Sequence, residues 1–264
     1  MKVSILAVLA ALLWAGLFAQ SLNLPESVAF DPQTGYFYVS NTGNGSIIRT
    51  KDLVSYSYFT QGKGAVRGLL VSGRRLYAAS DKGLLVFDLD RDALLKTHPV
   101  AGSTFLNDVA ADADGNVYIT DSKAHKVFKY DSAKGAVSTF IDSGIQSPNG
   151  ILYDEANKRL LLVSLRPSSP IQAISLPEGN VSTFKNTSNG NLDGLGMDKA
   201  GNLYFSSWQT SSIYRLKDAK SSPVKVLGGL SGPADFFVFE YGGGVHLLIP
   251  QLTGSSLRVA EVTP

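Results

Sequence analysis

Four short phrases of this sequence place an oxygen-bearing side chain at the same point, immediately before an apolar run. The phrases are LPESV, FLNDV, SPNGI and NLDGL, and the residues at the matching point are Glu26, Asn107, Asn149 and Asp193. Carboxylate and amide oxygens, without thiol or imidazole, are the ligands that hard cations prefer. Calcium accepts about six to eight oxygens in loose geometry, with water filling the open positions. If the fold gathers these side chains, they indicate a site for one divalent cation, with Ca²⁺ as the first choice.

The same residues also have a plainer interpretation. Asn and Asp are ordinary turn formers, so each of the four taken singly is expected in a turn. Their common register in a repeated phrase favours the metal site. Two carboxylates confined in one space also repel each other, and a divalent cation relieves that repulsion.

The phrases belong to a longer repeat that must position them. Each copy consists of an apolar segment, an Asp-x-x-Gly-type turn and a second apolar segment. The six copies are VAFDPQTGYFYVS, LLVSGRRLYAAS, VAADADGNVYITD, ILYDEANKRLLLVS, LGMDKAGNLYFSS and FFVFEYGGGVHLLIP. Aligned on Tyr38, Tyr77, Tyr118, Leu162, Tyr204 and Leu248, they are spaced by 39, 41, 44, 42 and 44 residues. Such a period, filled with strands, predicts an all-β six-bladed β-propeller with four-stranded blades. A sandwich or a barrel does not account for six copies of one period.

The propeller would bring the four phrases to one place. The innermost strand of each blade borders the central channel, so equivalent residues lie at one height around the axis. The residues at this position, blade by blade, are Glu26, Arg67, Asn107, Asn149, Asp193 and Ala234. The last repeat ends with SSLRVAEV, Ser255 to Val262. We therefore expect the sixth blade to be poorly closed, with three strands or a very short fourth.

The first residues, MKVSILAVLAALLWAGLFAQ, predict a secretory signal peptide. One cation precedes an apolar run from Val3 to Phe18, and cleavage is expected after Ala19. An uncleaved membrane anchor is the alternative, but the run is shorter than the roughly 20 residues that span a bilayer. We expect a signal peptide over residues 1–19 and one propeller domain over residues 20–264. The protein would be secreted or periplasmic, without stable membrane insertion after cleavage.

The composition of the sequence excludes several classes of function. The sequence has no cysteine, which excludes disulfides, thiolate metal sites and cysteine nucleophiles. Its formal net charge is +2, and no segment concentrates Lys and Arg with aromatic residues, so no nucleic-acid partner is expected. None of the three histidines, His98, His125 and His246, falls at a ring position, which argues against a histidine-based nucleophile. We expect a monomer that acts on a small molecule.

Four longer phrases carry a resemblance to a known family. LPESVAFDP, FLNDVAADADGNVYITD, SPNGILYDEANKRLLLVS and NLDGLGMDKAGNLYFSSW resemble the senescence-marker-protein (regucalcin), gluconolactonase and luciferin-regenerating-enzyme family, and the related diisopropylfluorophosphatase and bacterial lactonase propellers. The resemblance implies a catalytic divalent cation, usually Ca²⁺ and otherwise Zn²⁺, Mg²⁺ or Mn²⁺, with Glu26, Asn149 and Asp193 as direct ligands. Asn107 would lie on the substrate side, as a ligand or through water.

The activity that the resemblance implies is metal-assisted hydrolysis of a lactone or related ester. The cation would polarise the carbonyl and stabilise the developing oxyanion. Asp193 would be the catalytic residue, accepting a proton from the attacking water.

The sequence departs from the family at the substrate side. Sugar lactonases of the regucalcin type carry an arginine two residues before the blade 3 asparagine, where this chain has Phe105. Sugar-lactone specificity is therefore open, and a more apolar ester or lactone is the alternative. Arg67 would bind a substrate carboxylate or phosphate, or pair with Glu26 or Asp193. Trp208 would stack on a substrate ring or pack between blades.

Two other functions stay open at this point. One is a non-catalytic propeller that binds a ligand or a protein and holds a structural metal. The other is a strictosidine-synthase-like propeller, which does not depend on the metal ring. Fold alone does not decide among these, because propellers host many functions.

Overall fold

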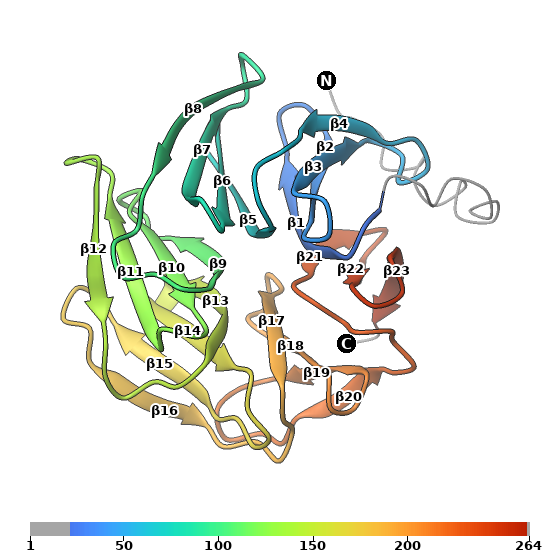
Figure 1. The fold of residues 1–264 in the computed structure, drawn as a ribbon. Helices are drawn as coiled ribbons and strands as arrows, with labels where there is room; N and C mark the ends of the chain where they lie inside the picture. Colours follow the sequence, from blue (N-terminus) through green and yellow to red (C-terminus); the bar gives the residue numbers. More distant parts are fainter. Residues whose placement is uncertain (1–21, 263–264) are drawn as a thin grey trace.

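A computed structural model describes residues 22–262, which form six antiparallel β-sheets arranged in a ring (Figure 1). Five sheets have four strands and the last has three. The predicted six-bladed β-propeller is confirmed, and so is the incomplete sixth blade. The predicted signal peptide, residues 1–19, lies outside the described residues. In the described range, no helix has the length and apolar character needed to cross a membrane.

The strands follow one another from the channel outward in every blade. Blade 1 contains β1 (Pro25–Asp31), β2 (Tyr36–Asn41), β3 (Ser46–Thr50) and β4 (Ser57–Thr60). Blade 2 contains β5 (Val66–Ser72), β6 (Arg75–Ser80), β7 (Gly83–Asp88) and β8 (Ala93–His98). Blade 3 contains β9 (Leu106–Ala111), β10 (Val117–Asp121), β11 (Lys126–Asp131) and β12 (Ala136–Ile141).

The second half of the ring continues the same order. Blade 4 contains β13 (Pro148–Asp154), β14 (Arg159–Ser164), β15 (Ile171–Ser175) and β16 (Val181–Lys185), with the short 3-10 helix η2 (Glu155–Asn157) between its first two strands. Blade 5 contains β17 (Leu192–Met197), β18 (Leu203–Ser207), β19 (Ser212–Leu216) and β20 (Val224–Leu227). Blade 6 contains β21 (Phe237–Tyr241), β22 (Gly244–Gln251) and β23 (Ser256–Val262).

The repeated Asp-x-x-Gly turns close the inner hairpins. In blade 3 the carboxylate of Asp112 accepts hydrogen bonds from the main-chain N–H of Asp114 at 3.0 Å and of Asn116 at 2.9 Å. Gly115 takes a φ of 79°, which a residue with a Cβ rarely adopts. Asp198 of blade 5 binds the N–H of Asn202 at 2.8 Å in the same way. These local bonds set the end of each inner strand independently of the rest of the fold.

The hydrophobic core lies between blades, since each blade packs against both neighbours. The tyrosines used to align the repeats in blades 1, 3 and 5 are almost completely buried in these layers: Tyr38, Tyr118 and Tyr204 are at most 1% exposed. One layer, for example, joins Tyr118 and Val127 of blade 3 to Ile151 and Leu160 of blade 4. A single blade cannot bury its faces alone, so the stacking of neighbours stabilises the ring.

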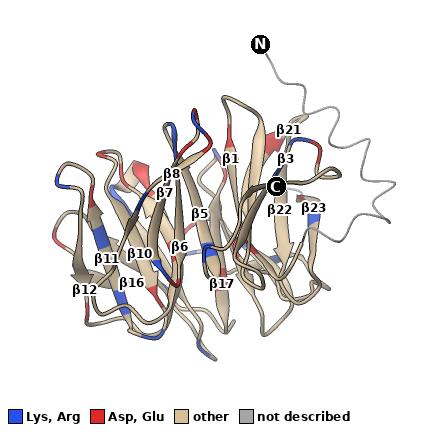
Figure 2. Ribbon diagram, turned by 45° about the horizontal axis from the view of Figure 1, so that its top comes forward, with Lys and Arg blue, Asp and Glu red and all other residues tan. Residues whose placement is uncertain are grey.

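Blades 6 and 1 close the ring without sharing a strand. In Figure 1 the first inner strand, β1, lies beside the last, β21. Phe37 and Phe237 pack across this boundary with ring centroids 6.2 Å apart. The N–H of Asp235 donates to the carbonyl of Glu26 at 3.0 Å. Figure 2 marks Lys and Arg in blue and Asp and Glu in red, and both colours occur along the ring without separating into two halves.

Candidate functional site

Bulges at the start of the inner strands place the predicted ring residues. The pairing of β1 with β2 passes from Pro25 to Val28, which leaves Glu26 and Ser27 outside the regular ladder. The same interruption occurs in blades 2 to 5, at residues 67–68, 107–108, 149–150 and 193–194. A bulge bends its strand and redirects a side chain. The same device, repeated in five blades, presents the first residue of each pair at the channel.

Hydroxyl groups on the second strands hold these bulges. Ser40, Thr120 and Ser206 accept hydrogen bonds from the N–H groups of the second bulge residues Ser27, Asp108 and Gly194, at 3.0, 2.9 and 2.7 Å. Each hydroxyl residue stands two positions after a buried tyrosine, as in YVS, YIT and YFS. Sequence reasoning missed them, and this recurrent spacing in the odd-numbered blades was the signal that could have found them.

All the sequence-predicted site residues line one pocket. It has a volume of about 400 Å³ and lies at the end of the channel where the inner strands begin. Its lining includes the seven predicted residues Glu26, Arg67, Phe105, Asn107, Asn149, Asp193 and Trp208. Thr42, Ala65, Leu165 and Leu252 complete the lining and were not predicted. None of the three histidines belongs to it.

Two buried oxygens at this pocket have no hydrogen-bond partner among residues 22–262. They are Oε2 of Glu26 and Oδ1 of Asn149, from residues that are 5% and 2% exposed. The Nδ2 group of Asn149 donates to the carbonyl of Leu192 at 3.4 Å, so the amide oxygen is the end left for a ligand. Buried polar atoms are rarely left unpaired, because each one costs free energy. The two atoms therefore mark a place where a cation would supply the missing interaction.

The surroundings of the two ring carboxyls raise their pKa values. Burial raises the pKa of Glu26 well above its usual value, and the charges of Asp193, Asp235 and Asp108 raise it further, whereas Arg67 opposes the shift. Burial also raises the pKa of Asp193 to about 7. A divalent cation would offset both effects by restoring charge balance in the channel.

A second layer of carboxyl groups lies one residue deeper. Asp108 and Asp235 directly follow the ring residues Asn107 of blade 3 and Ala234 of blade 6. Both border a pocket of about 240 Å³ farther along the channel. Asp108 accepts from the N–H of Ile151 at 2.8 Å, and Asp235 accepts from the hydroxyl of Ser27 at 2.6 Å. Burial raises the pKa of Asp108 to about 7. Sequence reasoning took these two residues as strand starts and missed this layer.

Arg67 has its partners outside the ring. Its Nη1 donates to Oδ1 of Asp81 at 2.8 Å and to the carbonyl of Leu106 at 3.1 Å. The guanidinium also lies over the ring of Phe105, 3.8 Å from the centroid. Of the alternatives that the sequence left open, the ion pair with Glu26 or Asp193 is therefore wrong, since Arg67 pairs with Asp81.

Phe105 and Trp208 stand on the wall of the pocket. The N–H of Phe105 donates to the buried carboxylate of Asp121 at 3.0 Å, which fixes the start of the loop into β9. Trp208 follows β18 and is half-buried, and its Nε1 has no hydrogen-bond partner in the described part of the chain. The indole and the amide of Asn149 nevertheless lie close enough to Asp193 to oppose the rise of its pKa.

The side chains present fit a hard cation. Glu26 and Asp193 supply carboxylate oxygens and Asn149 supplies an amide oxygen that lacks a partner, which is the donor set that calcium accepts. Within residues 22–262, no group of three or more His, Asp or Glu side chains is arranged to hold a metal. The candidate set has two carboxylates and an amide, so water or substrate must complete the coordination.

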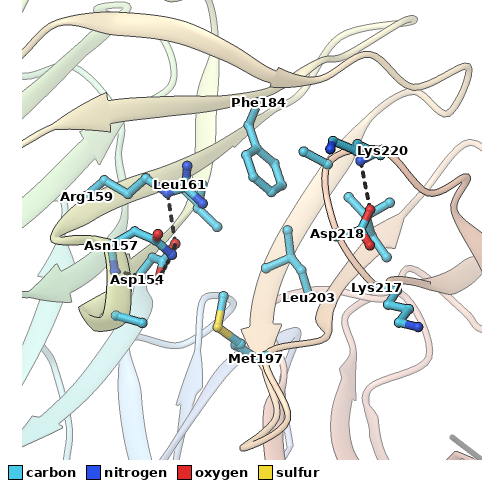
Figure 3. Close-up of a pocket in the computed structure, with 14 residues that line it drawn as sticks. Asp154, Asn157, Arg159, Leu161, Phe184, Met197, Leu203, Lys217, Asp218 and Lys220 are labelled. Carbon is cyan, nitrogen blue, oxygen red and sulfur yellow. Dashed lines mark hydrogen bonds and ion pairs between the residues drawn. The ribbon is translucent and has the colours of Figure 1, made fainter.

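A larger pocket of about 550 Å³ lies elsewhere, between blades 4 and 5 at the other end of the strands (Figure 3). Phe184 and Leu203 point into it. Arg159 lies over the Phe184 ring, 4.7 Å from its centroid, and donates to Asp154 at 2.8 Å. None of the sequence-predicted site residues lines this pocket.

Residues 20–226 match the family model described as the SMP-30/Gluconolactonase/LRE-like region. No curated protein sequence matches the chain. A gluconolactonase from Xanthomonas campestris has a similar structure, with a TM-score of 0.76 and 17% identity over 92% of this chain and 87% of that one.

Two further solved structures have the same fold. An auxiliary nutrient binding protein from Bacteroides thetaiotaomicron has a TM-score of 0.72 and 11% identity over 90% of this chain and 69% of that one. A chain of the nidogen/laminin complex has a TM-score of 0.69 and 16% identity over 87% of this chain and 93% of that one. At these identities the likeness establishes the fold alone.

Proposed function

The chain belongs to the SMP-30/gluconolactonase/LRE-like family, and from this premise we propose that it is a metal-dependent hydrolase of lactones or related esters. One observation carries the proposal: Glu26, Asn149 and Asp193 of three different blades line one pocket, and two of their buried oxygens lack partners. These three residues would hold a divalent cation, Ca²⁺ first. Their oxygen chemistry, with neither thiolate nor imidazole, supports that choice.

The chain's own residues would share the work of hydrolysis. A bound divalent cation supplies Lewis-acid polarisation of an ester carbonyl. Asp193 would accept the proton of the attacking water as the general base. Asn107 is 7% exposed, and its amide forms no hydrogen bond with any described residue, so it is available to orient the substrate. The carboxyl of Asp193 and the amide of Asn107 are buried beside the proposed cation. Bulk water is therefore excluded, and each electrostatic interaction is stronger.

A signal peptide over residues 1–19 would place this activity outside the cytoplasm, in the periplasm or the medium. We expect the protein to act there as a monomer on a small molecule. Calcium modules outside cells work with dissociation constants of roughly 0.1–1 mM. A site with two carboxylates, one amide and water suits that range.

A non-catalytic binding protein is the second candidate. It is supported by the shared fold with a nutrient binding protein and with a chain of a protein complex, as the names of those structures state. In that case the cation would be structural and the pocket would bind a ligand without turnover. A strictosidine-synthase-like protein would keep its activity in the presence of chelator.

Metal analysis joined to an activity screen tests the proposal. We expect the purified protein to bind about one Ca²⁺ and to hydrolyse simple lactones or aryl esters, with loss of activity in chelator and recovery after Ca²⁺ is added. Glu26→Gln and Asp193→Asn should lose both the metal and the activity.

Matched controls are available on exposed loops. Glu178→Gln and Asp142→Asn make the same chemical changes at exposed side chains away from the channel and should behave as the unchanged protein. If the two channel variants keep their metal content and hydrolysis, the assignment is wrong. Metal binding without turnover of any lactone or ester would favour the binding protein.

A further inference from the structure

The pocket that holds the oxygen ring has an apolar wall. Its side chains are Phe105, Leu165, Trp208, Leu252 and Ala65. They come from different loops: Ala65 and Phe105 precede β5 and β9, whereas Leu165, Trp208 and Leu252 follow β14, β18 and β22. Leu165 is 45% exposed, so a large hydrophobic side chain stands in water at the rim. Polar groups therefore line the inner end of the pocket, and hydrocarbon lines the part nearer to solvent.

Two polar side chains that border this wall, Arg67 and Thr42, have protein partners. The Nη1 group of Arg67 donates to Asp81 and to the Leu106 carbonyl, and the Phe105 ring covers one face of the guanidinium. The hydroxyl of Thr42 donates to the carbonyl of Leu24 at 2.9 Å. Among the five wall side chains, Nε1 of Trp208 is the one unpaired polar group, so most hydroxyls of a polyhydroxylated substrate placed against the wall would lose water without a replacement. Such an unpaired buried group is costly, whereas a hydrocarbon group would gain from leaving water.

We propose that the pocket takes lactones or esters that carry an alkyl or aryl substituent, and that it discriminates against polyhydroxylated sugar lactones. The part of this inference that concerns hydrolysis of the lactone or ester group rests on the proposed function. The preference of the wall is separate from it, because it concerns binding and not turnover. A volume of about 400 Å³ lies in the range of sites that enclose a small ligand. A six-membered lactone with a chain of a few carbons is of suitable size.

Three lactones with the same ring provide the first test. δ-Valerolactone is the bare ring, δ-decalactone adds a pentyl chain, and glucono-δ-lactone adds hydroxyl groups. We expect kcat/KM for δ-decalactone to exceed that for the bare ring at least tenfold, since each buried CH₂ contributes about fourfold. Glucono-δ-lactone should fall below the bare ring. A sugar lactone that is hydrolysed as well as δ-decalactone would overturn the inference.

A variant of the wall sharpens this test. Leu165→Ser removes hydrocarbon at a half-exposed position, where folding is little affected. We expect it to lower the ratio of kcat/KM for δ-decalactone to that for δ-valerolactone about fourfold or more. An unchanged ratio would show that the wall does not select the substituent.

A binding measurement keeps the inference testable without turnover. The sequence has only two tryptophans, Trp14 and Trp208. In the full chain carrying Trp14→Phe, fluorescence reports on Trp208 alone, which lines the pocket. We would titrate this protein, in CaCl₂, with two lactams that resist hydrolysis, 6-pentylpiperidin-2-one and the lactam of gluconic acid.

We expect the pentyl lactam to saturate the fluorescence change at a concentration at least tenfold lower than the gluconic lactam does. Equal or tighter binding of the gluconic lactam would overturn the inference, as would the absence of any fluorescence response to the pentyl lactam. If the pentyl lactam binds but no lactone is hydrolysed, the proposed hydrolase fails while the apolar preference stands. The two ideas therefore fail in distinguishable ways.

Discussion

The hydroxyl of Thr120 in blade 3 donates a hydrogen bond to the main-chain carbonyl of Asn149 in blade 4, at 2.7 Å. The same oxygen accepts from the N–H of Asp108 at 2.9 Å. One fully buried side chain thus joins the bulges of two neighbouring inner strands. Ser206 repeats the arrangement between blades 5 and 6, where it donates to the carbonyl of Ala234 at 3.2 Å. The position of the candidate ligand Asn149 depends on this contact.

Replacing that hydroxyl by a methyl group should therefore loosen the ring. Thr120→Val keeps the shape but leaves two buried main-chain groups unpaired, so we expect the free energy of unfolding to fall by about 2–4 kcal/mol. Urea denaturation measures this change, and calcium titration should show weaker binding. Thr120→Ser retains the hydroxyl and should lose much less. Equal losses in the two variants would mean that the hydrogen bonds are not the cause.

Gly150 stands where the inner strands of blades 4 and 5 approach each other closely. A Cβ at this position would overlap the main-chain oxygen of Asp193. Gly150→Ala should force the two inner strands apart and separate Asn149 from Asp193. We expect a loss of roughly 2 kcal/mol or more in stability, together with the loss of cation binding.

A matched alanine variant separates this effect from a general effect of removing glycine. Gly228→Ala places a Cβ in ordinary contact with Ser212, so it should be nearly neutral. Calorimetry of both variants and calcium binding by each provide the comparison. Normal calcium binding by Gly150→Ala would contradict the close approach on which the site depends.

The channel carboxyls predict an unusual dependence of stability on pH in the absence of metal. In the unfolded chain they ionise near pH 4, whereas in the folded chain burial raises the pKa values of Asp108 and Asp193 to about 7. Between these limits the folded state binds more protons than the unfolded state. The free energy of unfolding therefore falls as the pH rises from about 4 to 7. Each carboxyl contributes up to about 4 kcal/mol over the whole interval.

Added Ca²⁺ should remove most of this decrease in the free energy of unfolding with pH, because the bound cation stabilises the ionised carboxylates in the folded protein. Urea unfolding measured from pH 5 to 8, in chelator and in CaCl₂, tests the prediction. Carboxyls such as Asp31 and Asp52, whose pKa values hydrogen bonds lower, affect stability chiefly below about pH 4 and do not obscure the result. A stability that rises with pH in chelator would contradict the prediction.

Arg67 places a fixed positive charge near the candidate cation site. Its charge lowers the pKa of Glu26, which shows that the two groups interact. Arg67→Met keeps much of the packing against Phe105 but removes the repulsion, so we expect Ca²⁺ to bind several-fold more tightly, on the order of 1 kcal/mol. Calorimetric titration measures the affinity. Arg67→Lys retains the charge and is the control, and weaker binding by the Met variant alone would disprove the repulsion.

The repeat was readable from the sequence because each blade is specified locally. Six turns, four of them with an Asp that hydrogen-bonds within the turn, and six pairs of apolar strands recur at nearly one spacing, so the number of blades followed. The incomplete sixth blade followed from the residues left after its second strand. The convergence of Glu26, Asn149 and Asp193 on one pocket followed as well, because symmetry places equivalent residues around one axis.

The sequence by itself therefore determined the propeller and the membership of the oxygen ring, since both depend on residues that repeat in register. Tertiary structure alone decided that Arg67 pairs with Asp81, and that Leu165 and Leu252 join Phe105 in an apolar wall. Arg67 and Asp81 belong to one blade, whereas the wall joins loops of three different blades. No period relates such loops, and their partners are set only when the closed ring brings them together.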